Sequence, residues 1–256
     1  MPFAPPLRFP VDTSGTGVVL PVINLLIATQ NRHKLEEICA ILGREFHYLS
    51  LGDFPTAPQV VEDAGTFSGN SIRKAVELAK WTAAVLPNLS APQVIRGSGV
   101  FVLADDSGLE VDCLKGAPGV HSARFAALDT GQPGNSPSAD NNEKLLRLLR
   151  HIPMEKRTAR FRCVLALTPV LGFTTTNASP VCTADEFEFQ TQLFEGTCEG
   201  RILLTLQGSG GFGYDPLFIP DGYDQTFGQL PEQVKNQISH RVRALSKLKA
   251  HLVTRA

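Results

Sequence analysis

The sequence predicts an α/β fold, and three patterns in its 256 residues support that prediction. Short apolar runs that are typical of buried strands alternate with longer segments of helical character. In those longer segments the apolar residues recur every three or four positions, as on one face of an amphipathic helix. Residues 157–167 instead alternate apolar with basic side chains, as a half-buried strand does.

The first half of the chain supplies two strand–helix pairs and a third strand. Residues 22–28 predict the first strand, and residues 32–42 carry the first helical stripe. A second strand is expected at 46–51 and a second helix at 68–85. The apolar run 100–104 then predicts a buried strand that ends where two acids begin.

The second half continues the alternation after a surface linker at 129–139, which is rich in glycine, proline and serine. Asp140 is expected to cap the helix that follows. Residues 186–197 alternate around aromatic side chains and predict another strand. A final helix is expected to start with Pro231 at its first position and to run to Leu252.

Residues 1–20 are rich in proline and glycine and predict a flexible N-terminal extension, not a signal peptide. We expect residues 21–256 to form a single domain, with insertions near 87–99 and 170–185. No apolar stretch approaches the roughly 20 residues of a spanning helix, so we expect no membrane association.

The composition excludes several classes of protein. A hydrophobic content of 43% with 19% charged residues is ordinary for a globular domain. The net charge of −1 gives no field that would gather nucleic acid, so an anionic ligand must meet local basic residues. Five scattered cysteines without a CxxC pair argue against a disulfide framework or zinc site and predict a cytoplasmic protein.

The segment 104–109 (ADDSGL) is the most informative in the chain. Asp105 and Asp106 are expected at the carboxyl end of a strand, where open α/β sheets bind their ligands. Adjacent carboxylates can hold Mg²⁺, and one of them can deprotonate a water molecule. A turn, in which Asp and Gly serve only backbone geometry, explains the segment alone about as well.

Three other polar segments lie at the edges of predicted elements. Residues 29–34 join a strand to a helix and suit phosphate through free N–H groups and the helix dipole, although a capping turn is the alternative. Residues 208–216 form a glycine-rich loop that ends in aromatic and acidic side chains able to contact a base. Residues 235–241 place Lys235, His240 and Arg241 in the final helix, where basic residues are commonly just solvated.

Together these segments resemble the inosine triphosphate pyrophosphatase family, also called Ham1-like, from Asn24 to about Leu252. Its motif A-D-D-S-G-L is present unchanged at 104–109, and G-A-P-G-x-x-S-A-R is present at 116–124. Its other motifs T-G-N-x-x-K, F-x-E-N-A-x-x-K-A, G-F-G-Y-D-P-x-F and K-x-x-x-S-H-R are similar to residues 29–34, 67–75, 211–218 and 235–241.

The resemblance implies a mixed central β-sheet flanked by helices, in two lobes with an active-site cleft between them. It implies Mg²⁺-dependent hydrolysis of inosine, deoxyinosine and xanthosine triphosphates (ITP, dITP and XTP) to the monophosphate and pyrophosphate. This activity would cleanse the nucleotide pool. It also implies a homodimer.

The resemblance further implies roles for individual residues. Asp106 would activate the attacking water and hold Mg²⁺ together with Glu62, while Asp105 would support it. The residues implied to bind the triphosphate are Thr29, Gln30, Asn31, Arg32, His33, Lys34, Lys74 and Ser107. Those implied to surround the base are Phe212, Gly213, Tyr214, Asp215, Lys235, His240 and Arg241.

Two departures from the family pattern bear on these roles. Gln30 replaces a glycine and either crowds the phosphate loop or adds a contact. Gly69 replaces a glutamate, which either weakens metal binding or leaves Asp63 to compensate. A Maf-like pyrophosphatase acting on other modified nucleotides and a catalytically silent nucleotide-binding protein remain as alternatives. The lack of HExxH and GxSxG disfavours a zinc or serine hydrolase.

Overall fold

The computed structural model describes residues 23–86, 99–131, 133–171 and 184–253, and it confirms the α/β fold. One six-stranded sheet runs in the order β2-β1-β3-β4-β5-β6. The sheet is mixed, because β1 pairs in parallel with β2 and β3 while the remaining pairs are antiparallel. The strands are β1 (Asn24–Ala28), β2 (His47–Ser50), β3 (Val100–Val111), β4 (Thr158–Pro169), β5 (Gln192–Ile202) and β6 (Phe218–Pro220).

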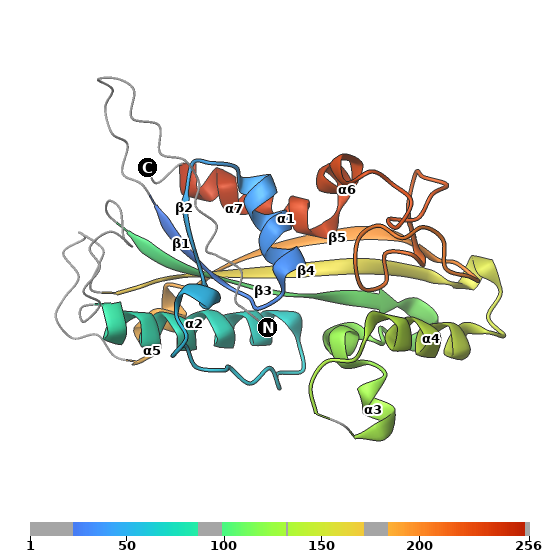
Figure 1. Cartoon of the computed structure of the whole chain (residues 1–256), viewed down its shortest axis with the longest axis horizontal. Coiled ribbons are helices and arrows are strands. Elements are labelled where there is room, and N and C mark those ends of the chain that lie inside the picture. Colours follow the sequence, from blue (N-terminus) through green and yellow to red (C-terminus); the bar gives the residue numbers. More distant parts are fainter. Residues whose placement is uncertain (1–22, 87–98, 132, 172–183, 254–256) are drawn as a thin grey trace.

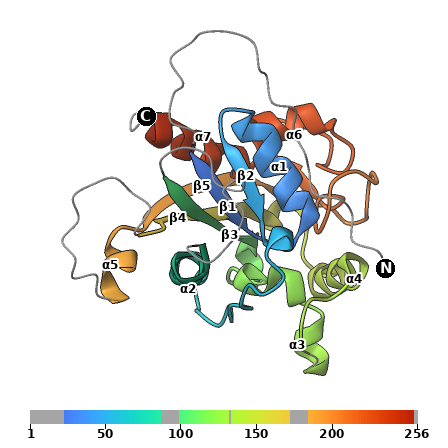
Figure 2. The same ribbon diagram turned by 60° about the vertical axis from the view of Figure 1, so that its left-hand side comes forward.

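Helices cover both faces of the sheet (Figures 1 and 2). Helices α1, α6 and α7 lie on one face, and α2, α4 and α5 lie on the other. The α-helices are α1 (Arg32–Leu42), α2 (Phe67–Val85), α3 (Ala127–Thr130), α4 (Ser138–Leu149), α5 (Ala184–Phe189), α6 (Glu232–Ile238) and α7 (His240–Val253). Short 3₁₀ helices are η1 (Leu51–Asp53), η3 (Asp112–Leu114), η4 (Gly119–Arg124) and η5 (Met154–Lys156).

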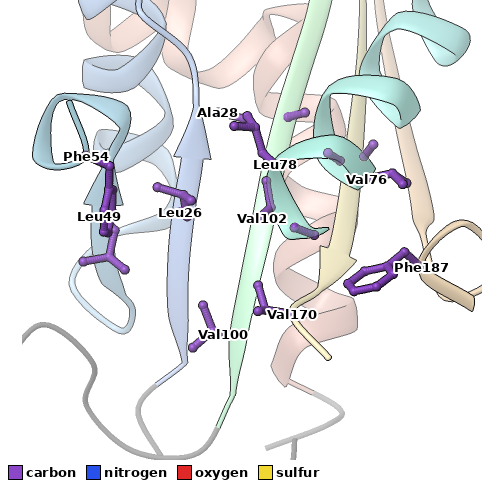
Figure 3. Packing of buried hydrophobic residues seen from close by; sticks show 14 of the residues in the cluster. Leu26, Ala28, Leu49, Phe54, Val76, Leu78, Val100, Val102, Val170 and Phe187 are labelled. Carbon is purple, nitrogen blue, oxygen red and sulfur yellow. The ribbon is translucent and has the colours of Figure 1, made fainter. Parts of the chain in front are cut away.

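The side chains of β3 alternate between two buried layers, because successive residues of a strand point to opposite faces. Val100 and Val102 pack with α2 and α5 in the cluster that Figure 3 shows. Leu103 packs on the other face, with α1 and α7. A third cluster, around α4 and β6, begins at Leu109 and fills the far end of the sheet. The long strands β3 and β4 contribute residues to all three clusters and so connect the two ends of the sheet.

Strand β3 is longer than the sequence predicts, which corrects the expected position of the acids. The strand continues to Val111 because β4 pairs with it along its whole length, from Phe101↔Pro169 to Val111↔Ala159. Asp105 and Asp106 therefore lie within the strand, and the turn interpretation is wrong. They follow the last parallel pair, Ala28↔Ala104, so they still lie where β1 ends.

Gly108 is required by the close approach of η4 to β3. A Cβ atom at this position would lie 2.4 Å from Oγ of Ser122 and 2.6 Å from the carbonyl oxygen of Gly119. The Ser122 hydroxyl also accepts a hydrogen bond from the N–H of Leu109 (2.9 Å). The glycine of ADDSGL thus lets the 116–124 motif dock beside the acids.

Two further element predictions are wrong. Residues 184–189 form helix α5, which buries Phe187 and leaves Phe189 exposed, so their spacing of two reflects no strand. Strand β5 begins only at Gln192, where its pairing with β4 begins. Helix α4 begins at Ser138 after an N-cap at Pro137, so Asp140 lies in its first turn.

The predicted final helix is split in two. Pro231 is the N-cap of α6 and not its first residue, and Ser239 is extended (φ −66°, ψ 159°) before the chain re-enters a helix as α7. On an unbroken helix Lys235 and Arg241 would lie about 120° apart around the axis. The break turns the chain so that the side chains of Lys235 and Arg241 both reach Glu37 of α1.

The predicted extension 1–20 and nearly all of the insertions near 87–99 and 170–185 lie outside the described residues. Val170 and Leu171, at the start of the second insertion, pack against the α2 cluster. Within the described ranges, no helix has the length and apolar character needed to cross a membrane.

Candidate active site

The two adjacent acids of β3, Asp105 and Asp106, face opposite layers. Asp105 faces α1 and α7, where it contacts Lys34 and Arg241. Asp106 faces α2, where it contacts Asn70. Both are buried, with 2% and 7% of their surface exposed. Strand alternation therefore gives two neighbouring carboxylates different surroundings, and their chemistry differs accordingly.

Asp105 is saturated with donors. The Lys34 ammonium donates to Oδ1 over 2.5 Å, and the Arg241 guanidinium donates to Oδ2 over 2.9 Å. The Ser107 hydroxyl also donates to Oδ1 (2.8 Å). Burial alone would raise the pKa of Asp105, but the charges of Arg241 and Lys34 hold it well below the usual range. Asp105 stays ionised and is engaged on both oxygens, so it is poorly suited to accept a proton.

Asp106 has much weaker support. In the part of the chain that the structure describes, its hydrogen-bond donor is the Asn70 amide, at 2.9 Å from Oδ2. Burial raises the pKa of Asp106 to about 6, although Lys34, Asn70 and Lys74 oppose that rise. A buried carboxylate with a pKa near neutrality and an oxygen to spare is suited to general-base catalysis.

Glu62 lies on the same side as Asp106 and contributes to the rise in its pKa through like charge. Its carboxylate pairs with Lys74 at 2.7 Å. The Lys74 ammonium also lies 3.2 Å from the carbonyl oxygen of Asp105, so it links this loop to β3. Arg124 of η4 donates to the carbonyl oxygen of Glu62 (3.1 Å). Two acids and one lysine thus gather beside the first turn of α2.

Asp63 does not replace the acid that is missing at Gly69. It pairs with Arg73 near the surface, and 62% of its side chain is exposed. A Cβ atom at Gly69 would lie 2.8 Å from the Ala64 Cβ, so this backbone is closely packed. Among the described residues, no group of three or more His, Cys, Asp or Glu side chains gathers as a metal cluster.

The loop from Thr29 to Lys34 begins α1 beside the acids. The Asn31 side chain accepts from the N–H groups of His33 (3.0 Å) and Lys34 (3.3 Å). The sequence predicted free N–H groups here, but these two are capped. Thr29 accepts from the N–H of Asn31 (3.1 Å). Gln30 is exposed, and Arg32 pairs with Glu36 at the surface. Lys34 turns inward to Asp105, and 17% of its side chain is exposed.

A buried ion network extends from Asp105 toward the residues that were expected to surround the base. Glu37 of α1 binds both the Lys235 ammonium (2.7 Å) and the Arg241 guanidinium. Asp215 accepts a second bond from Lys235 (2.8 Å). The network contains three acids and three cations: Glu37, Asp105, Asp215, Lys34, Lys235 and Arg241.

This balance of charge allows deep burial, because buried ions are tolerated when they are paired. Lys235 and Arg241 have only 4% and 1% of their surface exposed. Burial alone would lower the pKa of Lys235, but Asp215 and Glu37 raise it. Lys235 uses two of its three N–H donors on these acids, and Arg241 uses three of its five on Asp105, Glu37 and Ser107. Each cation therefore retains donor capacity.

The Phe212 ring covers both cations. The Lys235 ammonium lies 4.7 Å from the ring centroid, and the Arg241 guanidinium lies 5.8 Å from it. The Phe212 ring also stacks on His33, with centroids 5.5 Å apart. The Phe212 N–H donates to Asp215 (2.7 Å), which fixes the loop over the network. An aromatic surface, a residue of the 29–34 loop and buried donors are thus brought together.

Two of the residues expected to surround the base are held by the core. Tyr214 is 4% exposed, packs in the α4 cluster and donates through its hydroxyl to the carbonyl oxygen of Ser122 (2.9 Å). His240 is also buried and stacks on Phe161, with centroids 4.9 Å apart. Burial, with the charges of Arg241 and Lys235, lowers the pKa of His240 well below its usual value, so it is neutral. Its Nδ1 has no hydrogen-bond partner among the described residues.

The sequence did not identify Asn70 and Glu37 as site residues. Asn70 is the asparagine of the F-x-E-N-A motif and directly follows Gly69, which departs from that motif. Its place in the motif could have identified it. Glu37 is three residues after Lys34 and next to Ile38 of the apolar stripe, and an acid on a buried helix face requires a partner. Its partner Lys235 is 198 residues away, which no local pattern reveals.

This fold and site define an α/β enzyme whose buried acids are surrounded by cations, an arrangement suited to a phosphate-bearing substrate. A model of the Ham1 family matches residues 25–251. The chain belongs to the Ham1 family.

Similar proteins cover nearly the whole chain. A dITP/XTP pyrophosphatase from Desulforamulus reducens is 43% identical over 226 residues, which are 88% of this chain and 93% of that protein. A second, from Geobacter sulfurreducens, is 42% identical and covers 89% of this chain and 96% of its own length. The solved HAM1 protein from Coxiella burnetii has a TM-score of 0.68 at 31% identity, covering 92% of this chain and all of the other.

Proposed function

We propose that this chain is a Mg²⁺-dependent pyrophosphatase that hydrolyses inosine, deoxyinosine and xanthosine triphosphates to the monophosphate and pyrophosphate. The observation that carries the proposal is the contrast between the two acids, since Asp106 alone combines a near-neutral pKa with a free oxygen. The names of the two bacterial relatives, dITP/XTP pyrophosphatase, support the same reaction.

In this proposal Asp106 takes a proton from the water that attacks the α-phosphorus. Lys34 and Lys74 lie beside it and meet the negative charge of the triphosphate. The Asn70 amide holds one oxygen of Asp106 and leaves the other for the water. Ionised Asp105 keeps Lys34 in place, so the cation beside the acids is positioned before substrate arrives.

The residues fit a magnesium ion, because Mg²⁺ prefers oxygen ligands and commonly uses one or two carboxylates together with substrate phosphates. Asp106 and Glu62 would hold it, and both lie beside Lys74. When bound, it would neutralise charge that develops on the phosphates. The two carboxylates suffice for this binding mode, so the glycine at 69 does not remove the site.

Base selection follows from the donors beneath Phe212. A 6-oxo purine presents an acceptor to the remaining donors of Lys235 and Arg241, whereas adenine presents a donor of its own. A site that leaves buried polar groups unpaired can reject the wrong ligand by about 10⁴-fold. We therefore expect inosine, deoxyinosine and xanthosine triphosphates to be preferred strongly over ATP.

A panel of nucleoside triphosphates tests this function through the release of pyrophosphate. The panel contains ITP, dITP, XTP, GTP and ATP, each with Mg²⁺ and with EDTA. Rapid turnover of the first three, with pyrophosphate as product and loss of activity in EDTA, is expected. Equal rates on ATP and ITP would refute the base selection, and release of single phosphate would refute the cleavage site. A silent binding protein would release neither product.

Two family-level expectations belong to the same proposal. The enzyme should act in the cytoplasm, where nucleotide pools are maintained, and it should form a homodimer. Light scattering coupled to size-exclusion chromatography would measure the mass of the purified protein directly, and a mass of one chain would contradict the dimer.

A further inference from the structure

Asn70 joins the two parts of the site that carry its acids. It lies in the first turns of α2 and has 1% of its surface exposed. Its Oδ1 accepts from the N–H of Ala64 (2.9 Å), two residues after Glu62. Its Nδ2 donates to Oδ2 of Asp106 (2.9 Å). One side chain therefore spans from the Glu62 loop to strand β3.

The orientation of this amide is determined by its partners. The N–H of Ala64 can only donate, so it must meet Oδ1, and the NH₂ group is left to face the carboxylate. The helix that carries Asn70 is itself capped, because Thr66 accepts from the N–H of Gly69 (3.0 Å). A rotation of the Asn70 side chain would break both bonds, so the Asp106 carboxylate is held by a rigid support.

We propose that Asn70 is a positioning residue, which fixes the plane of the Asp106 carboxylate and its separation from Glu62. This inference rests on the proposed function of Asp106 as the base. Only a side chain with an acceptor at one end and a donor at the other can satisfy both partners. Aspartate can accept from Ala64 but cannot donate to Asp106 when ionised, and alanine does neither.

The chain offers a matched control in Asn141 of α4. Asn141 is also buried, with 5% of its surface exposed. Its Oδ1 accepts from the N–H of Ala126 (2.8 Å), and its Nδ2 donates to the carbonyl oxygen of Ala123 (3.2 Å). It therefore clamps backbone at both ends as Asn70 clamps Ala64, but it does not contact an acid. Its loss should affect folding alone.

The test compares Asn70→Ala, Asn70→Asp and Asn141→Ala with the wild type. Each protein is measured for kcat and KM on ITP, for affinity toward an uncleavable α,β-methylene ITP analogue, and for Tm. Both Asn70 variants should lose about 10²-fold in kcat, since a misplacement of about 1 Å costs this much. Their KM and analogue affinity should change by less than about threefold, because the loss falls on the transition state. Asn141→Ala should lower Tm and leave kcat unchanged.

The Tm of each variant shows whether it is folded. Asn70→Asp, which keeps the bond to Ala64 but places a second carboxyl beside Asp106, shows whether the Ala64 bond alone is enough. A kcat in both Asn70 variants no lower than that of Asn141→Ala would overturn the inference. A rise in KM with an unchanged kcat would also overturn the inference. Absence of turnover in the wild type would overturn the proposed function and this inference with it, whereas turnover retained by both Asn70 variants overturns the inference alone.

Discussion

The two faces of β3 place the same residue type, aspartate, in opposite surroundings. On the face toward α1 and α7, Asp105 belongs to a closed network of three acids and three cations. On the face toward α2, Asp106 has one amide donor and lies near Lys74 and Glu62 without a direct ion pair among the described residues. The pKa of Asp105 falls and that of Asp106 rises, although they are adjacent in the chain.

The comparison shows where a protein of this kind can place a reactive group. A saturated carboxylate stabilises its surroundings but has no capacity left for a substrate. An undersupported carboxylate is destabilising for the fold but reactive. Here the saturated face supports Lys34, which in turn contributes charge to the undersupported face. In the proposed function, the base Asp106 therefore depends on the ion network that holds Lys34.

The largest effect is expected for Asp106→Asn, which keeps the size of the side chain and removes its charge. If Asp106 is the base, kcat on ITP should fall by about 10²–10⁴-fold, the scale of a lost general base. The fold should survive, since Asp106 supports no ion network. Steady-state pyrophosphate release from the purified variant measures the effect. A near-native kcat would show that Asp106 does not act as the base.

The matching change on the other face, Asp105→Asn, should act on stability. It leaves the buried Arg241 and Lys34 without their shared acid, and breaking a buried pair in this way costs about 3–5 kcal/mol. Chemical denaturation followed by circular dichroism measures the free energy of unfolding. If Asp105→Asn instead unfolded like the wild type and lost all turnover, the roles of the two acids would be exchanged.

Much of the fold could be predicted from the sequence, because hydrophobic periodicity reports which face of an element is buried. The helices at 32–42 and 67–85 and the strand from Thr158 follow this rule. The length of β3 could not be predicted, because Asp, Ser and Gly are poor strand formers and only pairing with β4 carries them. The break at Ser239 was hidden for a different reason, because the apolar stripe of the predicted helix continues through it.

The site was predicted as a set of residues but not as an arrangement. The motifs identified Asp106, Lys34 and Lys235 as candidate site residues, yet the partners of these residues lie far away in the sequence. Glu37 contacts Arg241, which is 204 residues away in the sequence. Tyr214 packs in the core and donates a hydrogen bond to the carbonyl oxygen of Ser122. Which of two adjacent acids is saturated depends on these tertiary contacts. A motif gives the residue types, and the packing assigns their roles.

The raised pKa of Asp106 predicts opposite effects of pH on activity and stability. The base must be ionised, so kcat/KM should fall about tenfold per pH unit below about 6. For stability the sign is reversed. An acid whose pKa is higher in the folded state binds its proton more tightly when folded, so its contribution is lost as pH rises from 3.8 through about 6.

A rise of the pKa from 3.8 to about 6 corresponds to at most about 3 kcal/mol. Asp106→Asn should therefore unfold like the wild type near pH 4 and become more stable than the wild type, by up to this amount, near pH 7. Urea unfolding of both proteins at the two pH values provides the measurement. A variant that is less stable than the wild type at pH 7 would show that Asp106 supports the fold.

The smallest expected effect compares the two helix caps, one on each face. Asn31 caps α1, which carries Lys34 and Glu37, and Thr66 caps α2, which carries Asn70. Loss of either cap by alanine substitution should cost about 1 kcal/mol of unfolding free energy, since both side chains satisfy N–H groups at a helix start.

The kinetic outcomes of the two cap substitutions should differ. Helix α1 remains held by the ion pairs of Lys34 and Glu37 after its cap is lost, so Asn31→Ala should change KM for the triphosphate more than kcat. Helix α2 carries Asn70, which donates to Asp106, so Thr66→Ala should lower kcat by a few-fold. Measuring both variants for unfolding free energy, kcat and KM separates these effects. A fall in kcat that is equal in the two variants would mean that both faces position the base, and the division between a supporting face and a reactive face would be lost.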